Sequence, residues 1–256
     1  MAEGKNAAVF LGNFAQHHAQ AAQLHALAQA LAEITGAKLG VLGEAANSVG
    51  AHVVNALPVG GKNAKDMLAQ PMKAYVLLGV EPELECRDPA QAVAAMKQAG
   101  FVVALSPFQH KAVDYAHVML PIAPFTETAG TFVNTEGRAQ SFQGVVQPLG
   151  ETRPAWKVLR VLGNLLGLQG FDQQSADEVR VEALGANNEK INKNIHLDVA
   201  IAVPSAAVSA TAGVQRIAET PIYAADALVR RAPSLQKTRD GQAPVASMPQ
   251  IGRAHV

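Results

Sequence analysis

The apolar residues of this chain gather in five short runs that are separated by polar or helix-like segments. Each run is five or six residues long and ends at or next to Gly, Ser or Pro. Short apolar runs with such ends are typical of strands that are buried on both faces of a parallel sheet. The five predicted strands are residues 7–12, 38–42, 74–79, 101–105 and 117–121.

Segments with helical spacing lie between and after these runs. Leu24, Leu27 and Leu31 recur at helical intervals within residues 17–35, and Gly36 follows as a helix-ending residue. Further helices are predicted at residues 65–68, 88–98, 111–115, 156–168 and 176–184. Because helices alternate with the strands, the sequence predicts an α/β fold with a Rossmann-like, doubly wound parallel sheet.

Capping residues mark the expected starts of two helices. Asp88 has a side chain that accepts hydrogen bonds at an N-cap, and Pro89 is tolerated at the first helical position. Thr152, with Pro154 in the first turn, is expected to cap the helix at residues 156–168.

The character of the sequence changes after the strand-rich part. We expect residues 1–150 to form the α/β domain and residues 151–256 to form a mainly helical extension with a C-terminal docking tail. Residues 199–212 are rich in Ala, Val and Ser, and this composition predicts a linker. Residues 221–238 carry too many apolar side chains for a disordered tail, so we expect them to pack on their own domain or on a neighbour.

Two loops invite a functional interpretation. Residues 44–51 are predicted to form a loop after the second strand, with Asn, Ser and Gly suited to a turn. Residues 58–63 read PVGGKN, but Ala56 stands where a phosphate-binding loop needs its first glycine, and Asn63 stands where it needs Ser or Thr. We therefore interpret residues 58–63 as a turn.

Composition and charge exclude several classes of protein. The 256 residues include 21 basic and 21 acidic side chains, and this balance supplies no basic surface for nucleic acid. The single cysteine excludes a disulfide framework and any iron–sulfur cluster held by this chain alone, because such clusters need about four thiolates. No apolar run is long enough to span a bilayer and no signal peptide is evident, so we expect a cytoplasmic location.

Residues 120–140 are the stretch that packing explains least. Turn residues and polar side chains dominate this stretch directly after a buried strand, where α/β proteins place ligand-binding loops. Its charged side chains could act as acid, base and anion clamp (Glu127, Glu136 and Arg138). The alternative is a hairpin in which Arg138 pairs with a carboxylate and short polar side chains satisfy the backbone. We favour the alternative and predict no catalytic residue.

A motif within this stretch resembles a known family. Residues 127–140 read E-T-A-G-T-F-V-N-T-E-G-R-A-Q and follow a V-M-L-P strand. In these features the chain resembles the molybdopterin oxidoreductase superfamily and, more narrowly, the large iron–sulfur subunit of bacterial respiratory complex I, the NADH-quinone oxidoreductase. The resemblance runs from near residue 7 to about residue 240. That subunit is much longer, so the chain resembles its C-terminal portion, and the iron–sulfur clusters are expected only on the missing N-terminal region.

The resemblance implies a crevice at the carboxyl ends of the strands, where family members hold part of the pterin dinucleotide. The corresponding candidates are Gly79, Glu81, Pro82, Ser106, Glu127, Gly130, Thr131, Asn134, Glu136, Gly137 and Arg138. Glu81 stands where the cofactor-binding members usually have asparagine. A carboxylate beside a pyrophosphate costs on the order of 1 kcal/mol per charge pair even in a high dielectric. We therefore expect a vestigial crevice that has kept its shape and lost its cofactor.

Cys86, His18 and His25 are not predicted to bind a metal ion. Cys86 has acidic neighbours that disfavour its thiolate, and by the resemblance the molybdenum ligand lies in the missing region. His18 and His25 are about two helical turns apart, but no third ligand accompanies them. We expect neither a metal ion nor a redox cofactor in this segment.

The favoured hypothesis is a structural domain of complex I. It would contact other subunits of the peripheral arm and lie at the cytoplasmic side of the inner membrane without entering it. The first alternative is a molybdopterin-dinucleotide-binding domain of an active molybdenum oxidoreductase, and the second is a free-standing nucleotide-binding protein.

Overall fold

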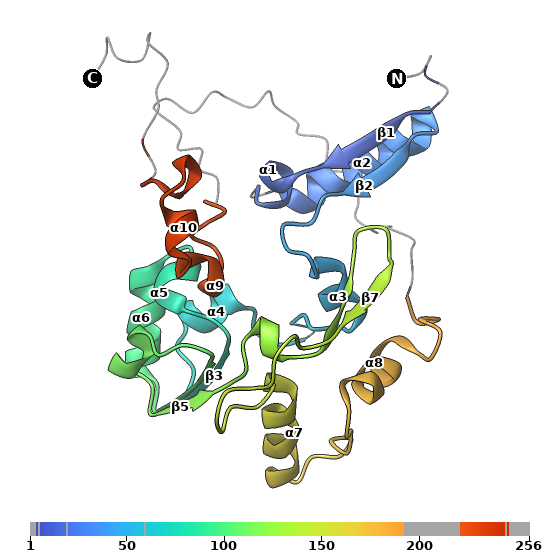
Figure 1. The fold of residues 1–256 in the computed structure, drawn as a ribbon. Coiled ribbons are helices and arrows are strands. Elements are labelled where there is room, and N and C mark those ends of the chain that lie inside the picture. Colours follow the sequence, from blue (N-terminus) through green and yellow to red (C-terminus); the bar gives the residue numbers. More distant parts are fainter. Residues whose placement is uncertain are drawn as a thin grey trace, which may run out of the picture. The chain divides into compact units, whose positions relative to one another are not determined.

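The chain divides into two compact units, shown in Figure 1. Unit 1 comprises Met1–Asn63 and Ala123–Ala210, and unit 2 comprises Ala64–Ile122 and Thr211–Val256. Each unit is thus built from two separate stretches of sequence. The computed structural model describes residues 4, 6–18, 20–58, 60–191, 221–243 and 245. The predicted linker at residues 199–212 lies outside these residues.

The strands of unit 2 form one parallel sheet in the order β3–β4–β5. They are β3 (Ala74–Leu78), β4 (Phe101–Ser106) and β5 (Val118–Pro121). Helix α6 (Pro89–Gln98) lies in the first connection, and the 3-10 helix η1 (Lys111–Asp114) lies in the second. Because the three strands are parallel, their carboxyl ends lie at one edge of the sheet, where such sheets present their loops.

Small and flexible apolar side chains form the core of unit 2. Met96 of α6 and Val102 of β4 are fully buried there. Tyr75 places a polar hydroxyl among them, and this hydroxyl donates to the Met67 carbonyl at 2.7 Å and accepts from the Met72 amide at 2.9 Å. The ring of Tyr75 therefore packs in the core without leaving a buried polar atom unsatisfied.

Helix α6 begins as the sequence predicts. The Asp88 carboxylate accepts a hydrogen bond from the Gln91 amide at 2.9 Å, and Pro89 occupies the first turn. The predicted helix at residues 65–68 is also present as α4 (Ala64–Ala69), and a further short helix, α5 (Pro82–Glu85), follows β3.

The C-terminal segment belongs to unit 2 and folds as α9 (Ala227–Arg230), α10 (Pro233–Gln236) and the 3-10 helix η3 (Arg239–Gly241). Asp226 caps α9 by accepting from the amides of Leu228 and Val229 at 2.8 and 3.0 Å. In Figure 1 the segment, coloured red, lies next to α5. It thus packs on its own unit, one of the two placements that its apolar content predicted.

Unit 1 contains a second parallel pair, β1 (Ala8–Leu11) with β2 (Lys38–Val41), connected through α1 (Asn13–Gln16) and α2 (Ala21–Thr35). The helix predicted to begin at residue 17 therefore starts at Ala21 instead. Its buried face consists of Ala26, Ala28 and Ala32, whereas Leu27 and Leu31 remain 43% exposed. The leucine spacing identified the helix correctly but not the side chains that it buries.

An antiparallel hairpin and three helices complete the described part of unit 1. The hairpin pairs β6 (Gly130–Val133) with β7 (Ala139–Phe142) and follows the 3-10 helix η2 (Phe125–Glu127). The helices are α3 (Ser48–Val53), α7 (Ala155–Leu165) and α8 (Ala176–Leu184). Residues 120–140 therefore contain the hairpin that the sequence offered as an alternative.

Two local predictions in unit 1 were wrong. The loop expected at residues 44–51 is present only at residues 44–47, and the chain is helical from Ser48. Asn47 lies in this turn, and its Oδ1 accepts from the Val133 amide at 2.9 Å. Thr152 does not cap α7, whose N-cap is Pro154. The Thr152 hydroxyl donates instead to the Leu149 carbonyl at 2.7 Å, which tightens the preceding turn.

The predicted α/β class is confirmed. In the described residues, the predicted strands form two parallel sheets, β1–β2 and β3–β4–β5, with helices in the connections. Residues 151–191 and 221–243 contain helices and turns but no strand, in agreement with the predicted helical extension. Among the described residues, no helix combines the length and the apolar character needed to cross a bilayer.

We predict that Gly163→Ala destabilises unit 1. Gly163 is buried in α7, and an added methyl group would overlap the ring of Phe171. Overpacking of this kind costs about 1–3 kcal/mol. This cost exceeds the gain of about 1 kcal/mol in helix propensity on replacing glycine with alanine.

Urea denaturation of the full chain measures this effect. Leu165→Ala is the matched control on the same helix, because the Leu165 side chain is exposed and its truncation leaves no cavity. A Gly163→Ala variant as stable as the wild type would contradict the packing of Phe171 against α7.

Candidate functional site

The candidate site lies where β3 and β4 end. Gly79 follows β3 with a φ of +61°, a left-handed conformation that glycine adopts without strain, and its amide donates to the Leu105 carbonyl at 2.9 Å. This turn leads the chain to Glu81 and to Pro82 at the start of α5. Ser106 ends β4, and its hydroxyl accepts from the Phe108 amide at 3.1 Å. Four of the predicted crevice residues are thus gathered in unit 2.

Glu81 is the buried charge at the centre of this site. Only 3% of the residue is exposed, and two arginines of the C-terminal segment bind its carboxylate. Arg231 donates to both oxygens, at 2.6 and 3.1 Å, and Arg230 lies 3.0 Å from Oε1. Arg230 also donates to Glu85 at 2.7 Å. The guanidinium of Arg231 stacks over the Phe108 ring, with 4.4 Å between its Cζ and the ring centroid.

The arginines determine the ionisation of Glu81. Burial alone would raise the pKa of this carboxyl group, but the hydrogen bonds and charges of Arg231 and Arg230 outweigh burial and lower the pKa below its ordinary value. Burial likewise tends to lower the pKa of Arg230, and its bonds to Glu85 and Glu81 raise that pKa instead. Glu81 and Arg230 are therefore charged at neutral pH.

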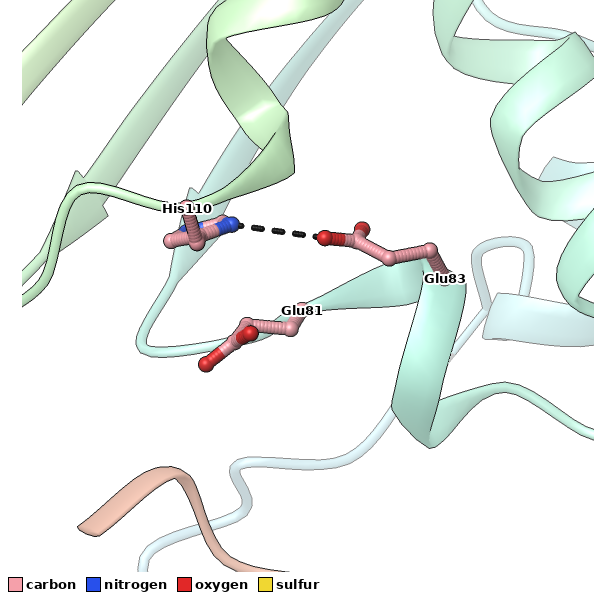
Figure 2. A group of neighbouring side chains, drawn as sticks. All are labelled: Glu81, Glu83 and His110. Carbon is pink, nitrogen blue, oxygen red and sulfur yellow. Dashed lines mark ion pairs between the residues drawn. The ribbon is translucent and has the colours of Figure 1, made fainter. Parts of the chain in front are cut away.

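A second buried carboxylate, Glu83, lies beside Glu81 on α5. Its Oε2 accepts from the Tyr115 hydroxyl at 2.9 Å, and its Oε1 faces His110 Nδ1 at 3.5 Å (Figure 2). Burial and the bond to Glu83 raise the pKa of Tyr115, so this phenol stays protonated. Burial, followed by the charges of Glu85 and Glu83, raises the pKa of the nearby Cys86 thiol. The sequence-based expectation that acidic neighbours disfavour its thiolate is thus supported.

A cavity of about 380 Å³ opens at the carboxyl ends of β4 and β5. It is lined by Ser106, Pro107, Phe108, Gln109, Val113, Ala116, Met119, Leu120 and Pro121. Its size is within the range of small-molecule pockets. None of the lining side chains carries a charge, so the cavity suits an apolar or neutral ligand better than an anion.

The remaining predicted site residues lie on the hairpin of unit 1. Asn134 holds the β6–β7 turn, because its Oδ1 accepts from the amides of Glu136 and Arg138 at 3.0 and 2.9 Å. Arg138 lies 3.8 Å from Glu136, and both side chains are at least 70% exposed. Such an exposed pair contributes little stability. The expectation that short polar side chains satisfy the backbone of a hairpin is therefore confirmed for Asn134, whereas the Arg138 pair is a loose surface contact.

The four other candidates in and beside the hairpin are also engaged in local structure. Glu127 accepts from the Leu149 amide at 3.0 Å, and the hydroxyls of Thr131 and Ser141 lie 3.0 Å apart across the two strands. Gly137 has a φ of +74°, as a turn glycine should. Gly130 is needed for another reason, because a Cβ there would lie 2.6 Å from the Phe142 ring.

Sequence reasoning missed the residues that dominate the site in unit 2. Arg230 and Arg231 are about 150 positions from Glu81, and no local pattern links such distant residues. One signal was present: Asp226 is a good N-cap, so it predicts a helical turn that places two consecutive arginines next to each other. Tyr115 and His110 reach Glu83 from the region around η1, which the pattern of apolar residues also could not indicate.

The comparisons with known proteins identify the family. The sequence profile of the family described as Molybdopterin oxidoreductase matches residues 1–165 of this chain. The chain belongs to this molybdopterin oxidoreductase family.

The relatives are oxidoreductases by name. "Probable oxidoreductase YjgC" of Bacillus subtilis (strain 168) is 34% identical over 106 residues, which are 41% of this chain and 11% of that protein. A "Putative formate dehydrogenase" of Staphylococcus aureus (strain USA300) is 39% identical over 74 residues, 29% of this chain and 8% of that protein. The matched part of the chain thus spans about a tenth of the length of these relatives.

The residues at the strand ends of unit 2 do not fit the pyrophosphate of a pterin dinucleotide. Such a group needs cationic side chains or a row of backbone amides. The two arginines present are already neutralised by Glu81 and Glu85, and Glu83 adds a further buried negative charge. The neighbouring cavity offers no cation. We therefore derive no chemical step through the family's cofactor.

We predict that Glu81→Gln strongly destabilises unit 2. The substitution keeps the volume of the side chain but leaves two arginines facing an uncharged amide. Removing one partner of a buried ion pair costs about 3–5 kcal/mol. Because Arg231 is partly exposed, we expect about 2–4 kcal/mol in urea unfolding.

Glu136→Gln is the matched control, since it removes the same charge from an exposed position. We expect this control to change the free energy of unfolding by less than about 0.5 kcal/mol. Equal stability of the two variants would show that the buried pair contributes nothing.

The same ion pair predicts a loss of stability in acid. The folded-state pKa of Glu81 lies below the ordinary value of 4.5. The stability that the ion pair contributes is therefore fully present above about pH 4.5, and it is lost as the pH falls through the lowered folded-state pKa. The wild type should therefore lose more stability between neutral pH and about pH 3 than Glu81→Gln does. Thermal unfolding of both proteins across this pH range measures the difference, and parallel curves would contradict it.

Proposed function

We propose that this chain is a structural portion of the large iron–sulfur subunit of an NADH-quinone oxidoreductase of the complex I type. In this role it keeps the family fold, holds neighbouring subunits of the peripheral arm in place and carries no redox cofactor itself. Its location is the cytoplasmic side of the inner membrane, to which it is attached through the complex. Electron transfer belongs to clusters on other parts of the complex.

The observation that carries this proposal is the binding of Glu81 by Arg230 and Arg231. An anionic cofactor at these strand ends would meet the carboxylates of Glu81 and Glu83. It could recruit the arginines only by breaking their bonds to Glu81, which leaves this buried carboxylate without partners. Such a loss costs several kcal/mol, so the chain's own C-terminal segment outcompetes the anion.

The resemblance of residues 127–140 to the complex I subunit supports the narrower assignment. Here the hairpin side chains bind one another and the neighbouring backbone, as Asn134 does with the amides of its own turn. They therefore have a structural role that needs no ligand. A single cysteine also agrees with clusters placed elsewhere in the complex.

The competing candidate is a molybdopterin-dinucleotide-binding domain of an active molybdenum oxidoreductase. The name of the Staphylococcus aureus relative favours it, because that name denotes a formate dehydrogenase. The cavity of about 380 Å³ at the ends of β4 and β5 also gives a ligand room to enter. The charges around Glu81 are the observation against it.

The decisive experiment is the molybdenum and pterin content of the natively purified chain together with any subunits that copurify. We expect neither group in stoichiometric amount, whereas iron should be present when neighbouring subunits are retained. An active molybdenum-dependent formate dehydrogenase purified in the same way serves as the positive control. About one pterin per chain would overturn the structural proposal in favour of the competing candidate.

A thermal shift with inorganic pyrophosphate tests the physical basis separately. The wild type should show no shift, because its arginines are engaged by carboxylates. In Glu81→Gln the arginines lose their main partner, so pyrophosphate should raise the melting temperature of that variant relative to the same variant without ligand. A shift in the wild type as large as in Glu81→Gln would contradict the blocking role of Glu81.

A further inference from the structure

The side chains of Glu81, Glu83 and His110 form a compact group of oxygen and nitrogen ligands. Each offers one ligand atom, and these atoms all lie within 4.8 Å of one another. All three side chains are at least nine-tenths buried, with exposed fractions of 4%, 8% and 3%. Within the described residues, this is the one group of His, Cys, Asp or Glu side chains with such spacing. Figure 2 shows His110 and Glu83 pointing toward each other, with Glu81 beside them.

The hydrogen bonds around His110 identify an unprotonated nitrogen. The Ala112 amide donates to His110 Nδ1 at 3.3 Å, so this nitrogen carries a lone pair, and a metal ion bound there would replace this long hydrogen bond. The other ring nitrogen, Nε2, is buried without a hydrogen-bond partner among the described residues. Glu83 Oε1 faces Nδ1 of the same ring at 3.5 Å. Two atoms that can accept hydrogen bonds therefore face each other in a buried place, an arrangement that repels unless a proton or a metal cation lies between them.

Glu83 Oε1 points into the group without a partner. Its sister oxygen Oε2 accepts from Tyr115, but Oε1 has no hydrogen bond from any residue that the structure describes. A buried carboxylate oxygen without a donor is expensive and calls for an explanation. This unpartnered atom is an observation independent of the clustering itself.

The distance between His110 and Glu83 fits a small divalent ion of the zinc type. Zinc binds imidazole nitrogen and carboxylate oxygen at about 2.0–2.2 Å, so two ligands of a tetrahedral ion lie about 3.3–3.6 Å apart. The separation of 3.5 Å between His110 Nδ1 and Glu83 Oε1 falls in this interval. Imidazole with carboxylates is a donor set that zinc and related transition metals accept, whereas Mg²⁺ and Ca²⁺ prefer oxygen alone.

The charge of the surroundings also favours a cation. Glu81, Glu83 and Glu85 carry three negative charges, and Arg230 and Arg231 carry two positive ones, which leaves one negative charge in the cluster. The arginines bind Glu81 and Glu85, so the excess negative charge resides on Glu83. A divalent cation between Glu83 and His110 would offset this negative charge without displacing either arginine, and the cluster would then carry one net positive charge.

We propose that Glu83 and His110, with Glu81 as a third ligand shared with the arginines, bind one divalent transition-metal cation of the zinc type. This site lies at the carboxyl edge of the β3–β4–β5 sheet and shares Glu81 with the crevice that the family resemblance predicts. It does not depend on the proposed structural role in complex I, since a structural zinc ion is compatible with a chain that holds no redox cofactor. Three protein ligands leave one position of a tetrahedral ion for water or another small ligand.

The test is a zinc titration of the full chain after treatment with a chelator and removal of the chelator. We expect one zinc ion per chain, measured by isothermal titration calorimetry and by metal analysis after gel filtration. Glu83→Gln and His110→Gln should each weaken binding by at least about tenfold, since even outer-shell partners of a metal contribute 10–100-fold. Circular dichroism of each variant verifies that it is folded.

His17→Gln is the matched control. His17 and Glu44 form the same type of pair, 2.7 Å apart, but at the surface, with side chains 61% and 44% exposed. The control should bind zinc as the wild type does. Absence of zinc binding by the wild type, or loss of binding in His17→Gln with binding retained in His110→Gln, would overturn the proposal.

Arg231→Gln tests the shared ligand and keeps the buried ligands intact. Arg231 donates to both oxygens of Glu81, so its removal releases that carboxylate toward the metal and should tighten zinc binding several-fold. Unchanged or weaker zinc binding in a folded Arg231→Gln variant would contradict the role of Glu81 as a ligand.

Discussion

The bond between Glu81 and the two arginines of the C-terminal segment is the interaction on which unit 2 depends. A carboxylate with 3% exposure is tolerated only when cations or donors replace the water that it has lost. Arg231 supplies two hydrogen bonds and Arg230 a close charge, and they come from a part of the chain that has no strand in this sheet. The pair therefore fixes the C-terminal segment, the start of α5 and the edge of the sheet in one arrangement.

The same interaction separates the fold of this chain from the chemistry of its family. Parallel strands with loops at their carboxyl edge are a general platform for ligands, but a platform determines where a ligand can bind and not which one. At this edge the chain places carboxylates and uses its own arginines to balance them. Membership of the molybdopterin oxidoreductase family thus explains the architecture and leaves the chemistry of the edge to be derived from the side chains themselves.

Sequence patterns predicted the strands and helix starts that depend only on residues close together in the chain. The runs at β3 and β4 indicated strands because their apolar content has no polar interruption, but only β4 is largely buried, whereas Val76 and Leu78 of β3 are 54% and 43% exposed. Asp88 with Pro89 indicated the start of α6 because capping involves residues three positions apart. The pattern failed where a distant element decides. Leu27 and Leu31 indicated helix α2 by their spacing, yet the buried residues of this helix are Ala26, Ala28 and Ala32. Thr152 looked like an N-cap, yet its hydroxyl bonds to the preceding turn.

The position of the candidate site was predictable, because Gly79, Glu81 and Ser106 follow two predicted parallel strands. The residues that bind Glu81 and Glu83 were not predictable, because they come from connections that no periodicity describes.

Because unit 2 is built from two separate stretches of sequence, the order of synthesis determines when its parts can meet. Glu81 and Arg231 are separated by 150 positions, and part of unit 1 is encoded between them. At about 5–20 residues per second, a ribosome needs roughly 8–30 seconds to add the arginine after the glutamate. During that interval the carboxylate has no partner and stays in water, so the edge of the sheet cannot close. Unit 2 therefore completes its fold only after the segment with Arg230 and Arg231 has been synthesised, although its first strand emerges much earlier.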